Sequence, residues 1–195
     1  MAAPRIGVFG GTFDPIHIGH LAAAVEVRHA LALDRVLLVV SNTPWQKVGS
    51  RSITAAEDRY AVVEAAAAGL EGIEPSRIEI DRGGESYTAD TLAELTRGHP
   101  GAELFLVVGA DIAAALDTWA RGAEIRDLAH LAVVTRPGSE DSAIPPGWDG
   151  VTVTVPSIAV SSTDLRARVA DGRPIDVLVP PAAVRCIRER GLYAG

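Results

Sequence analysis

The stretch GVFGGTFDPIHIGHLAAAVEV, from Gly7 to Val27, joins an apolar run to an alanine-rich segment through two adjacent glycines and two histidines. The apolar run has the length of a buried strand, and the alanine-rich part has the composition of a helix. Gly10 and Gly11 lie between them, where the absence of a Cβ allows the backbone to turn sharply and to approach a ligand closely. The stretch therefore predicts a strand that ends in a ligand-binding turn and leads directly into a helix.

The rest of the chain repeats this alternation. Apolar runs predict strands at 5–9, 35–41, 103–111, 131–138 and 151–156, and helical patterns predict helices at 20–33, 55–70, 88–98, 111–129, 161–172 and 181–191. Most of the runs are continuous, which is typical of strands covered on both faces. The pattern predicts an α/β fold: a doubly wound, mostly parallel, Rossmann-like sheet with helices on both faces. No linker divides residues 1–195, so we expect a single domain.

Charge and composition exclude several classes of partner. The formal net charge is −7, which disfavours binding to a nucleic acid polymer or an anionic membrane. The single Cys186 excludes an internal disulfide and a cysteine-based metal site. The first residues do not form a secretory signal, and no apolar stretch has the length of a membrane span. We therefore expect a cytoplasmic protein. The sequence is compatible with a homo-oligomer but does not determine the oligomeric state.

Candidate binding residues follow the predicted strands. Ligands of open α/β sheets bind beyond the carboxyl ends of the strands, where the topology makes a crevice. Four segments follow directly on predicted strands, and a fifth opens a helix: 10–20, 41–47, 109–111, 136–138 and 161–166. We expect these segments to meet at one edge of the sheet.

His17 and His20 are spaced i and i+3, which predicts one face of the first helical turn. The start of a helix favours a phosphate through its unpaired N–H groups and its dipole. Two alternatives remain: a metal site with Asp14 as third ligand, or two unrelated structural histidines. The adjacent glycines favour phosphate contact, although the stretch matches neither G-x-G-x-x-G nor a Walker A loop.

GGTFDPIHIGH (10–20) resembles the H-x-G-H signature of the nucleotidyltransferase superfamily, and VSSTDLR (160–166) resembles its second motif, I-S-S-T-x-x-R. Within that superfamily the chain resembles the bacterial nicotinate-nucleotide adenylyltransferases. The resemblance runs nearly end to end, through SNTPWQK, ESYTADTL, VVGAD and VTRPG. It implies transfer of the adenylyl group of ATP to nicotinate mononucleotide, which yields nicotinate adenine dinucleotide and pyrophosphate in NAD biosynthesis.

This reaction suits the residues available. A phosphate monoester has a second pKa of about 6, so the attacking group is already an anion near neutral pH and requires no general base. The protein must instead align two anions and stabilise the charge that spreads over the phosphoryl oxygens. His17, His20, Lys47 and Arg166 are the available donors and cations, and His17, His20 and Arg166 are the predicted catalytic residues.

The resemblance assigns the ATP site to residues at both ends of the chain, with His20 stabilising the transition state. The predicted ATP-binding residues are Gly10, Gly11, Thr12, Phe13, His17, His20, Gly109, Asp111, Ser161, Ser162, Thr163 and Arg166. Ser161 to Thr163 are also N-cap residue types, Asp111 could cap the helix that follows it, and Arg166 could be an ordinary solvated side chain. Mg²⁺ is expected with ATP, held mainly by phosphates and water, with no metal ligand from the protein.

The resemblance assigns the mononucleotide to Asn42, Lys47, Tyr87, Thr88 and Trp119. Trp119, on the predicted helix 111–129, offers a flat surface for the pyridine ring, and a core position is the alternative. Tyr87 and Thr88 open a helix whose free N–H groups could bind the ring carboxylate. Asn42 and Lys47 follow the second strand and would face the phosphate, unless Lys47 is simply solvated.

The chain also departs from the family pattern. Trp45-Gln46 stands where many relatives have Pro-His, and Gly122 stands where many have a second Trp. Nicotinamide mononucleotide or another phosphate monoester, such as phosphopantetheine, is the alternative acceptor. A catalytically silent nucleotide sensor on the same fold is the alternative from a different class. A cytidylyltransferase would carry a different second motif.

Overall fold

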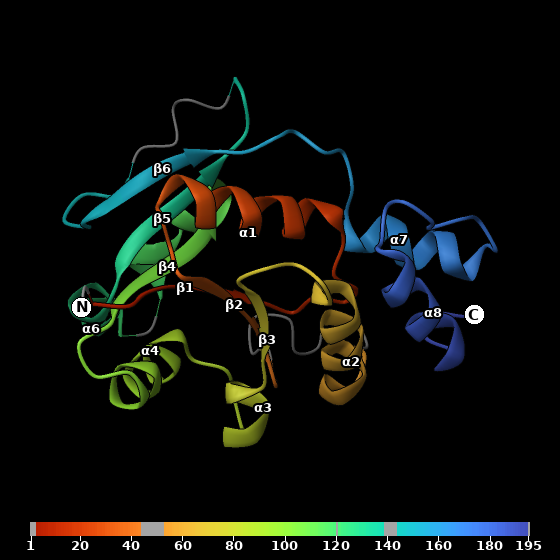
Figure 1. Ribbon diagram of the computed structural model, residues 1–195, viewed down its shortest axis with the longest axis horizontal. Coiled ribbons are helices and arrows are strands. Elements are labelled where there is room, and N and C mark those ends of the chain that lie inside the picture. The colour runs from red at the N-terminus through yellow and green to blue at the C-terminus, as the bar shows by residue number, and fades with distance from the viewer. Residues whose placement is uncertain (1–2, 44–52, 120, 139–143, 195) are drawn as a thin grey trace.

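The computed structural model describes residues 3–43, 53–119, 121–138 and 144–194. Its strands form one six-stranded sheet in the order β3-β2-β1-β4-β5-β6, and every neighbouring pair is parallel (Figure 1). The strands are β1 (Arg5–Gly11), β2 (Arg35–Val40), β3 (Ile73–Ser76), β4 (Glu103–Gly109), β5 (His130–Thr135) and β6 (Gly150–Thr154). This order confirms the predicted Rossmann-like, doubly wound sheet.

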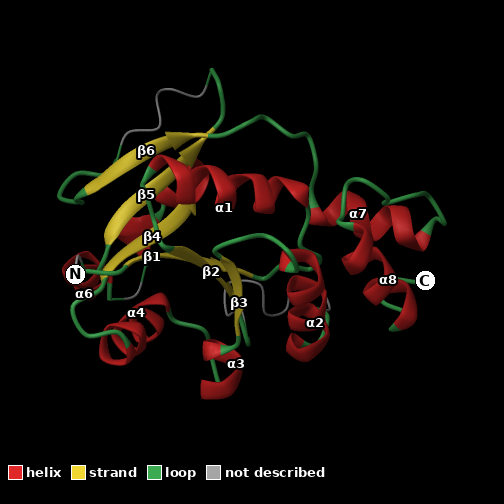
Figure 2. Ribbon diagram, in the orientation of Figure 1, coloured by secondary structure: helices red, strands yellow, loops and turns green. Residues whose placement is uncertain are grey.

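Helices cover both faces of the sheet (Figure 2). They are α1 (Ile18–Ala30), α2 (Ala56–Ala67), α3 (Ile78–Arg82), α4 (Thr88–Gly98), α5 (Ala110–Ala113), α6 (Gly122–Leu128), α7 (Ser162–Ala170) and α8 (Pro181–Glu189), with a 3₁₀ turn, η2, at Leu116–Thr118. Among the described helices, none is both long enough and apolar enough to cross a membrane.

The continuous apolar strands supply two separate cores. In β2, Val36, Leu38 and Val40 pack in the core with α1, α2, α7 and α8, whereas Leu37 and Val39 pack in the core with α4, α5 and α6. Successive side chains of a strand point to opposite faces, so a strand between two helical layers must be apolar at every position.

The central strands separate at their carboxyl ends. β1 pairs with β2 as far as Gly11↔Val40, but its pairing with β4 ends at Val8↔Leu106. From β1 the chain continues through β2 and β3 toward one edge of the sheet, and it then returns to β4 and continues toward the other edge. The gap between β1 and β4 therefore lies where the order of the strands reverses. In folds of this class, that position is where ligands bind.

One edge strand, β3, and one short helix, α3, were not predicted from the sequence. β3 reads Ile-Glu-Pro-Ser and α3 has five residues, so neither carries a recognisable apolar pattern. Both are stabilised by their neighbours: β3 pairs with β2, and α3 lies beside it. Short elements of this kind are decided by tertiary contacts rather than by propensity.

The predicted single helix at 111–129 is wrong. The structure divides it into α5, η2 and α6, with Arg121 in the left-handed region at φ 63°. Leu116 and Ile125 are both buried in the same core, yet nine residues apart on one helix they would point to opposite sides. The break lets both pack on one face of the sheet, and it leaves Trp119 in an extended conformation outside any helix.

Two glycines provide a test of the packing at the sheet edge. A Cβ at Gly150 of β6 would lie 2.5 Å from the Leu131 carbonyl oxygen, whereas a Cβ at Gly98, at the end of α4, would meet no atom within 4 Å. Gly150→Ala should lower the free energy of unfolding by about 1–3 kcal/mol through overpacking. Gly98→Ala should leave it unchanged or raise it by up to about 1 kcal/mol. Denaturant unfolding measures both, and equal stability of the two variants would contradict the packing described.

Candidate active site

A cavity of about 640 Å³ opens between the separated ends of β1 and β4. Its volume lies in the range of small-molecule and cofactor sites. The walls come from the end of β1 and the turn that follows it, from Ser41 after β2, from Gly109 at the end of β4 and Asp111 beyond it, and from the starts of α4 and α7. Segments far apart in the sequence therefore meet at the edge of the sheet formed by the carboxyl ends of the strands, as predicted.

Most of the predicted binding residues line this cavity. Of the ATP set, the lining contains Gly10, Gly11, Thr12, Phe13, His20, Gly109, Asp111, Ser162, Thr163 and Arg166, and of the mononucleotide set it contains Tyr87, Thr88 and Trp119. His17, Ser161 and Asn42 are not part of the lining. Lys47, with Trp45 and Gln46, falls outside the described residues.

The two glycines at the end of β1, Gly10 and Gly11, serve different purposes. A Cβ at Gly10 would meet no protein atom within 4 Å, although Gly10 lies on the cavity wall. A Cβ at Gly11 would come within 2.7 Å of the Phe13 ring. Gly10 thus leaves space on the cavity side, whereas Gly11 makes room for Phe13, whose backbone adopts the left-handed region at φ 46°.

His20 is held in a defined orientation in the first turn of α1. Its Nδ1 accepts a hydrogen bond from the backbone N–H of His17 at 3.3 Å, so the neutral ring carries its proton on Nε2. The His17 ring stacks on one side with centroids 3.7 Å apart, and Phe13 makes an edge contact at 5.2 Å. His20 therefore presents an N–H donor on a ring that is fixed by its neighbours.

His17, unlike His20, does not line the cavity, and the prediction that both histidines point at one anion stays a prediction. His17 is the N-cap residue of α1, is only 8% exposed, and its ring stacks on that of His20. Burial lowers the pKa of His17 to about 4, so the ring is neutral at pH 7. Within the described part of the chain its buried Nδ1 has no hydrogen-bond partner. Because the N-cap residue has an extended backbone, the His17 ring is buried while the His20 ring lines the cavity.

The start of α7 is fastened to the turn between β1 and α1. Ser161 caps α7, with its Oγ accepting the Asp164 N–H at 3.1 Å, as predicted for at least one of the three hydroxyl residues. Ser162 Oγ donates to the Pro15 carbonyl at 2.8 Å, and Arg166 Nη1 donates to the Asp14 carbonyl at 2.7 Å. Arg166 is therefore a half-buried, hydrogen-bonded part of the cavity wall and not an ordinary solvated side chain.

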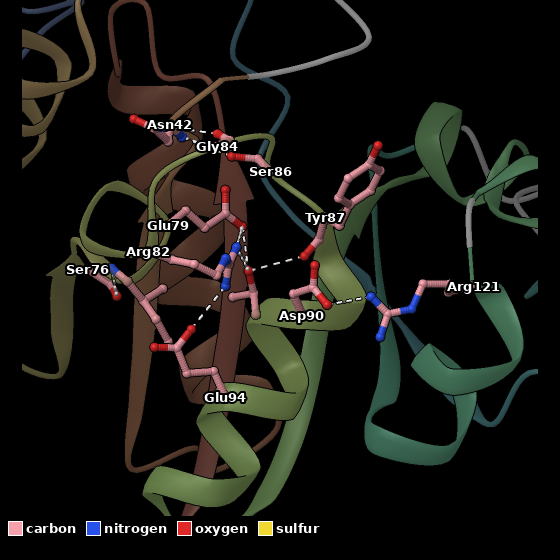
Figure 3. A network of polar contacts seen from close by, with 12 residues as sticks. Asn42, Ser76, Glu79, Arg82, Gly84, Ser86, Tyr87, Asp90, Glu94 and Arg121 are labelled. Atoms are coloured by element: carbon pink, nitrogen blue, oxygen red, sulfur yellow. Dashed lines mark hydrogen bonds and ion pairs between the residues drawn. The ribbon is translucent and has the colours of Figure 1, made fainter.

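The other half of the cavity includes the start of α4, and Figure 3 shows the polar contacts around that helix start. Asn42 does not face the cavity; its Nδ2 donates to the Gly84 carbonyl and its N–H to Ser86 Oγ, both at 2.9 Å. It thereby joins the loop after β2 to the segment that precedes α4. Trp119 both packs against the α4-side core and lines the cavity, so the core and binding alternatives are compatible.

Two polar residues of the lining, Glu79 and Thr91, were not predicted from the sequence. Glu79 on α3 is 6% exposed, and its Oε1 accepts a 2.6 Å hydrogen bond from Thr91 Oγ1 on α4. Arg82 Nη2 donates to the same Thr91 hydroxyl at 3.0 Å, and Arg82 Nη1 donates to Glu94 at 3.1 Å (Figure 3). Nothing in the sequence marks this cluster, because it depends on how α3 meets α4.

Two buried charged residues lie at the site: Asp14, considered from the sequence only as a metal ligand, lines the cavity, and Arg59 was not predicted. Asp14 is 2% exposed and accepts a 3.0 Å hydrogen bond from the Tyr193 hydroxyl near the end of the chain. Arg59 of α2 is 1% exposed. It shares the buried stripe of its helix with Val62, Val63 and Ala66, so a cation on an apolar helical face is a signal that could have identified it.

The metal-site alternative is not supported by the geometry. Among the residues that the structure describes, no group of three or more His, Cys, Asp or Glu side chains could hold a metal ion. Asp14, His17 and His20 therefore do not form the three-ligand set considered for the opening stretch.

Comparison with known proteins agrees with this architecture. The model of the cytidylyltransferase-like family matches residues 8–168. A probable nicotinate-nucleotide adenylyltransferase of Corynebacterium kroppenstedtii is 49% identical over 193 residues, which cover 97% of this chain and 91% of the relative. The Streptomyces coelicolor protein of the same name is 50% identical over 189 residues, covering 95% and 99%.

A solved structure shares the fold. Nicotinic acid mononucleotide adenylyltransferase of Plasmodium falciparum, complexed with NaAD, superposes with a TM-score of 0.78 at 17% identity, covering 97% of each chain. The family match over most of the chain and the identity of about half the residues to full-length relatives lead to one conclusion. This chain belongs to the nicotinate-nucleotide adenylyltransferases of the cytidylyltransferase-like family.

Proposed function

We propose that this protein transfers the adenylyl group of ATP to nicotinate mononucleotide in the cytoplasm, as a step of NAD biosynthesis. An oxygen of the mononucleotide phosphate attacks the α-phosphorus of ATP, the bond to the β-phosphate oxygen breaks, and pyrophosphate leaves with the electron pair. The observation that carries the proposal is the single cavity that joins His20 and Arg166 in one half to Trp119 and the start of α4 in the other. The names of the close relatives support the choice of substrates.

The ATP half supplies donors where negative charge must be stabilised. His20 presents Nε2–H, Arg166 supplies a positive charge, and α1 begins beside the cavity. Fixed donors in a site shielded from water stabilise developing charge without reorganising during the reaction. Since the attacking phosphate is already ionised, alignment and charge stabilisation suffice.

His17 takes a supporting part in this proposal. Its buried ring stacks on His20 and is neutral, so it fixes the orientation of the donor. Its unpaired Nδ1 is available for the ATP phosphates once they approach the start of α1. Ser161, Ser162 and Thr163 complete the phosphate contacts at the start of α7.

Mg²⁺ enters with ATP in this proposal. The lining offers the separate carboxylates Asp14, Glu79 and Asp111 but, within the described chain, no three-ligand group. Mg²⁺ would therefore be held mainly by phosphates and water, which is common for this ion, and when bound it would supply neutralisation of negative charge on the phosphates.

The mononucleotide half provides a flat surface and backbone donors. Trp119 would stack on the pyridine ring, and the N–H groups at the start of α4, beside Tyr87 and Thr88, would bind the ring carboxylate. Asn42 would act through the loop that it joins to Gly84 and Ser86. A phosphate contact by Lys47 stays a prediction.

Nicotinate mononucleotide should be preferred over nicotinamide mononucleotide by about tenfold or more in kcat/KM, which corresponds to about 1.4 kcal/mol. Backbone N–H donors bind a carboxylate but meet an NH₂ group unfavourably. Pyrophosphate release with ATP and Mg²⁺ is measured for both mononucleotides and for phosphopantetheine. Equal efficiency with the acid and the amide would reject the acceptor site, and no release with any acceptor would favour a nucleotide sensor.

His20→Ala should lower kcat by about 10²–10³-fold while the affinity for ATP changes far less, because the donor acts on charge that develops in the transition state. His29→Ala is the matched control, since His29 is exposed near the end of the same helix. Steady-state kinetics, ATP titration and thermal melting are measured for both. A near-normal kcat in the folded His20 variant would exclude His20 from catalysis.

Trp119→Ala should raise the KM for the mononucleotide by about tenfold or more, since stacking on a flat ring contributes about 1–3 kcal/mol per base in comparable sites. ATP affinity should stay close to that of the unmodified protein. Trp119→Phe, which keeps a smaller ring, should recover part of the loss. Equal loss of ATP binding, or unfolding of the alanine variant, would assign Trp119 to the core alone.

A further inference from the structure

Arg59 is a buried cation that takes no part in the chemistry proposed above. It lies in the first turn of α2, is 1% exposed, and directs its guanidinium toward backbone carbonyl groups. The bonds run from Nη1 to Thr12 at 2.7 Å, from Nη2 to Ser41 at 2.6 Å and Asn42 at 3.1 Å, and from Nε to Thr54 at 2.8 Å. One side chain thus bonds to three separate segments.

Two of these segments belong to opposite halves of the cavity. Thr12 lies in the turn after β1, beside the ATP half, and Ser41 lines the cavity after β2. Asn42 continues the connection, because its own amide groups bond to Gly84 and Ser86 ahead of α4. The fork of Arg59 therefore connects the turn expected to hold ATP with the loop expected to face the mononucleotide.

The chemistry of the side chain explains why an arginine stands here. Burying a charged group is costly unless its N–H groups are hydrogen-bonded. A planar guanidinium carries five donors in a fixed fork, whereas a lysine ammonium is a point charge with three rotatable donors. Arg59 and the buried carboxylate of Asp14 both act on the Tyr193 hydroxyl. Burial and the negative charge of Asp14 raise the pKa of Tyr193, whereas the positive charge of Arg59 lowers it.

We propose that Arg59 is a positioning residue of this active site. It holds the turn after β1 and the loop after β2 at a fixed separation, so that the α-phosphate of ATP and the attacking phosphate meet in line. The inference rests on the proposed function. Arg59 would control the position of both substrates although none of the described residues of α2 lines the cavity. A displacement of about 1 Å of a substrate-positioning segment is enough to lower a rate by about a hundredfold.

Arg59→Lys tests this role, with Val63→Ala as the matched control. The lysine variant keeps the charge but cannot reach all four carbonyls, whereas Val63→Ala shortens a buried core side chain of the same helix and leaves the fork intact. Arg59→Lys should lower kcat by about tenfold or more and raise the KM for ATP and for the mononucleotide by about threefold or more. Val63→Ala should lower the Tm yet keep all three parameters within about twofold.

Both variants are assayed at a temperature where circular dichroism shows them folded. The inference is overturned if the lysine variant matches the unmodified protein, if Val63→Ala loses as much activity, or if Arg59→Lys does not fold at any temperature. In the last case Arg59 supports the whole domain and not the separation of two loops.

Calorimetric titration with ATP and Mg²⁺, without any acceptor, separates this inference from the proposed function. If the unmodified protein releases no pyrophosphate with nicotinate mononucleotide, the proposed function fails. Weaker ATP binding in Arg59→Lys than in Val63→Ala would still support the positioning role, and equal binding in the two variants would overturn it.

Discussion

The separation of β1 from β4 is the constraint on which the site depends. Parallel strands are joined by connections that cross the faces of the sheet, so the loops that follow them collect at one edge. β1 continues to pair with β2 beyond the point where its pairing with β4 ends, and the cavity opens in that gap. Its walls are then the ends of the strands themselves, supported by two apolar cores.

The turn after β1 is held by residues that are distant in the sequence. Its carbonyls accept from Arg59 at Thr12, from Arg166 at Asp14 and from Ser162 at Pro15. Backbone carbonyl and N–H groups that are removed from water require hydrogen-bond partners. An irregular turn lacks the regular backbone hydrogen bonds of a helix or sheet, so its partners must come from other residues. The bonds satisfy this requirement and fix the turn at the same time. The geometry of the turn at the cavity wall is thereby tied to α2 and α7.

The two histidines illustrate how position on one helix turn separates two roles. His17 at the N-cap is buried and neutral, and its ring supports His20, which reaches the cavity. Their spacing is that of neighbours on a helix face, but an N-cap residue has extended backbone angles and points its side chain differently from a residue inside the helix. As a result, His20 presents one donor, its Nε2–H, because its Nδ1 accepts the His17 N–H.

Local patterns were enough for the regular parts of the fold. Continuous apolar runs gave the parallel sheet with two covered faces, and the helix predicted at 88–98 begins and ends where the structure has α4. The two motifs at opposite ends of the chain carried the resemblance to the family, because each combines small residues with histidine or arginine side chains at a fixed spacing. These features depend on neighbouring residues alone, so the sequence contains them directly.

Tertiary structure decided the rest. The break at Arg121, the short elements β3 and α3, the burial of His17 and the Glu79–Thr91 contact all depend on which distant surfaces meet. Arg59 is the clearest case, since its carbonyl partners are brought together only when the loop after β2 and the turn after β1 reach the same edge. The physical reason is that burial and hydrogen-bond partners are properties of the folded chain, whereas apolar period and motif spacing are properties of the sequence.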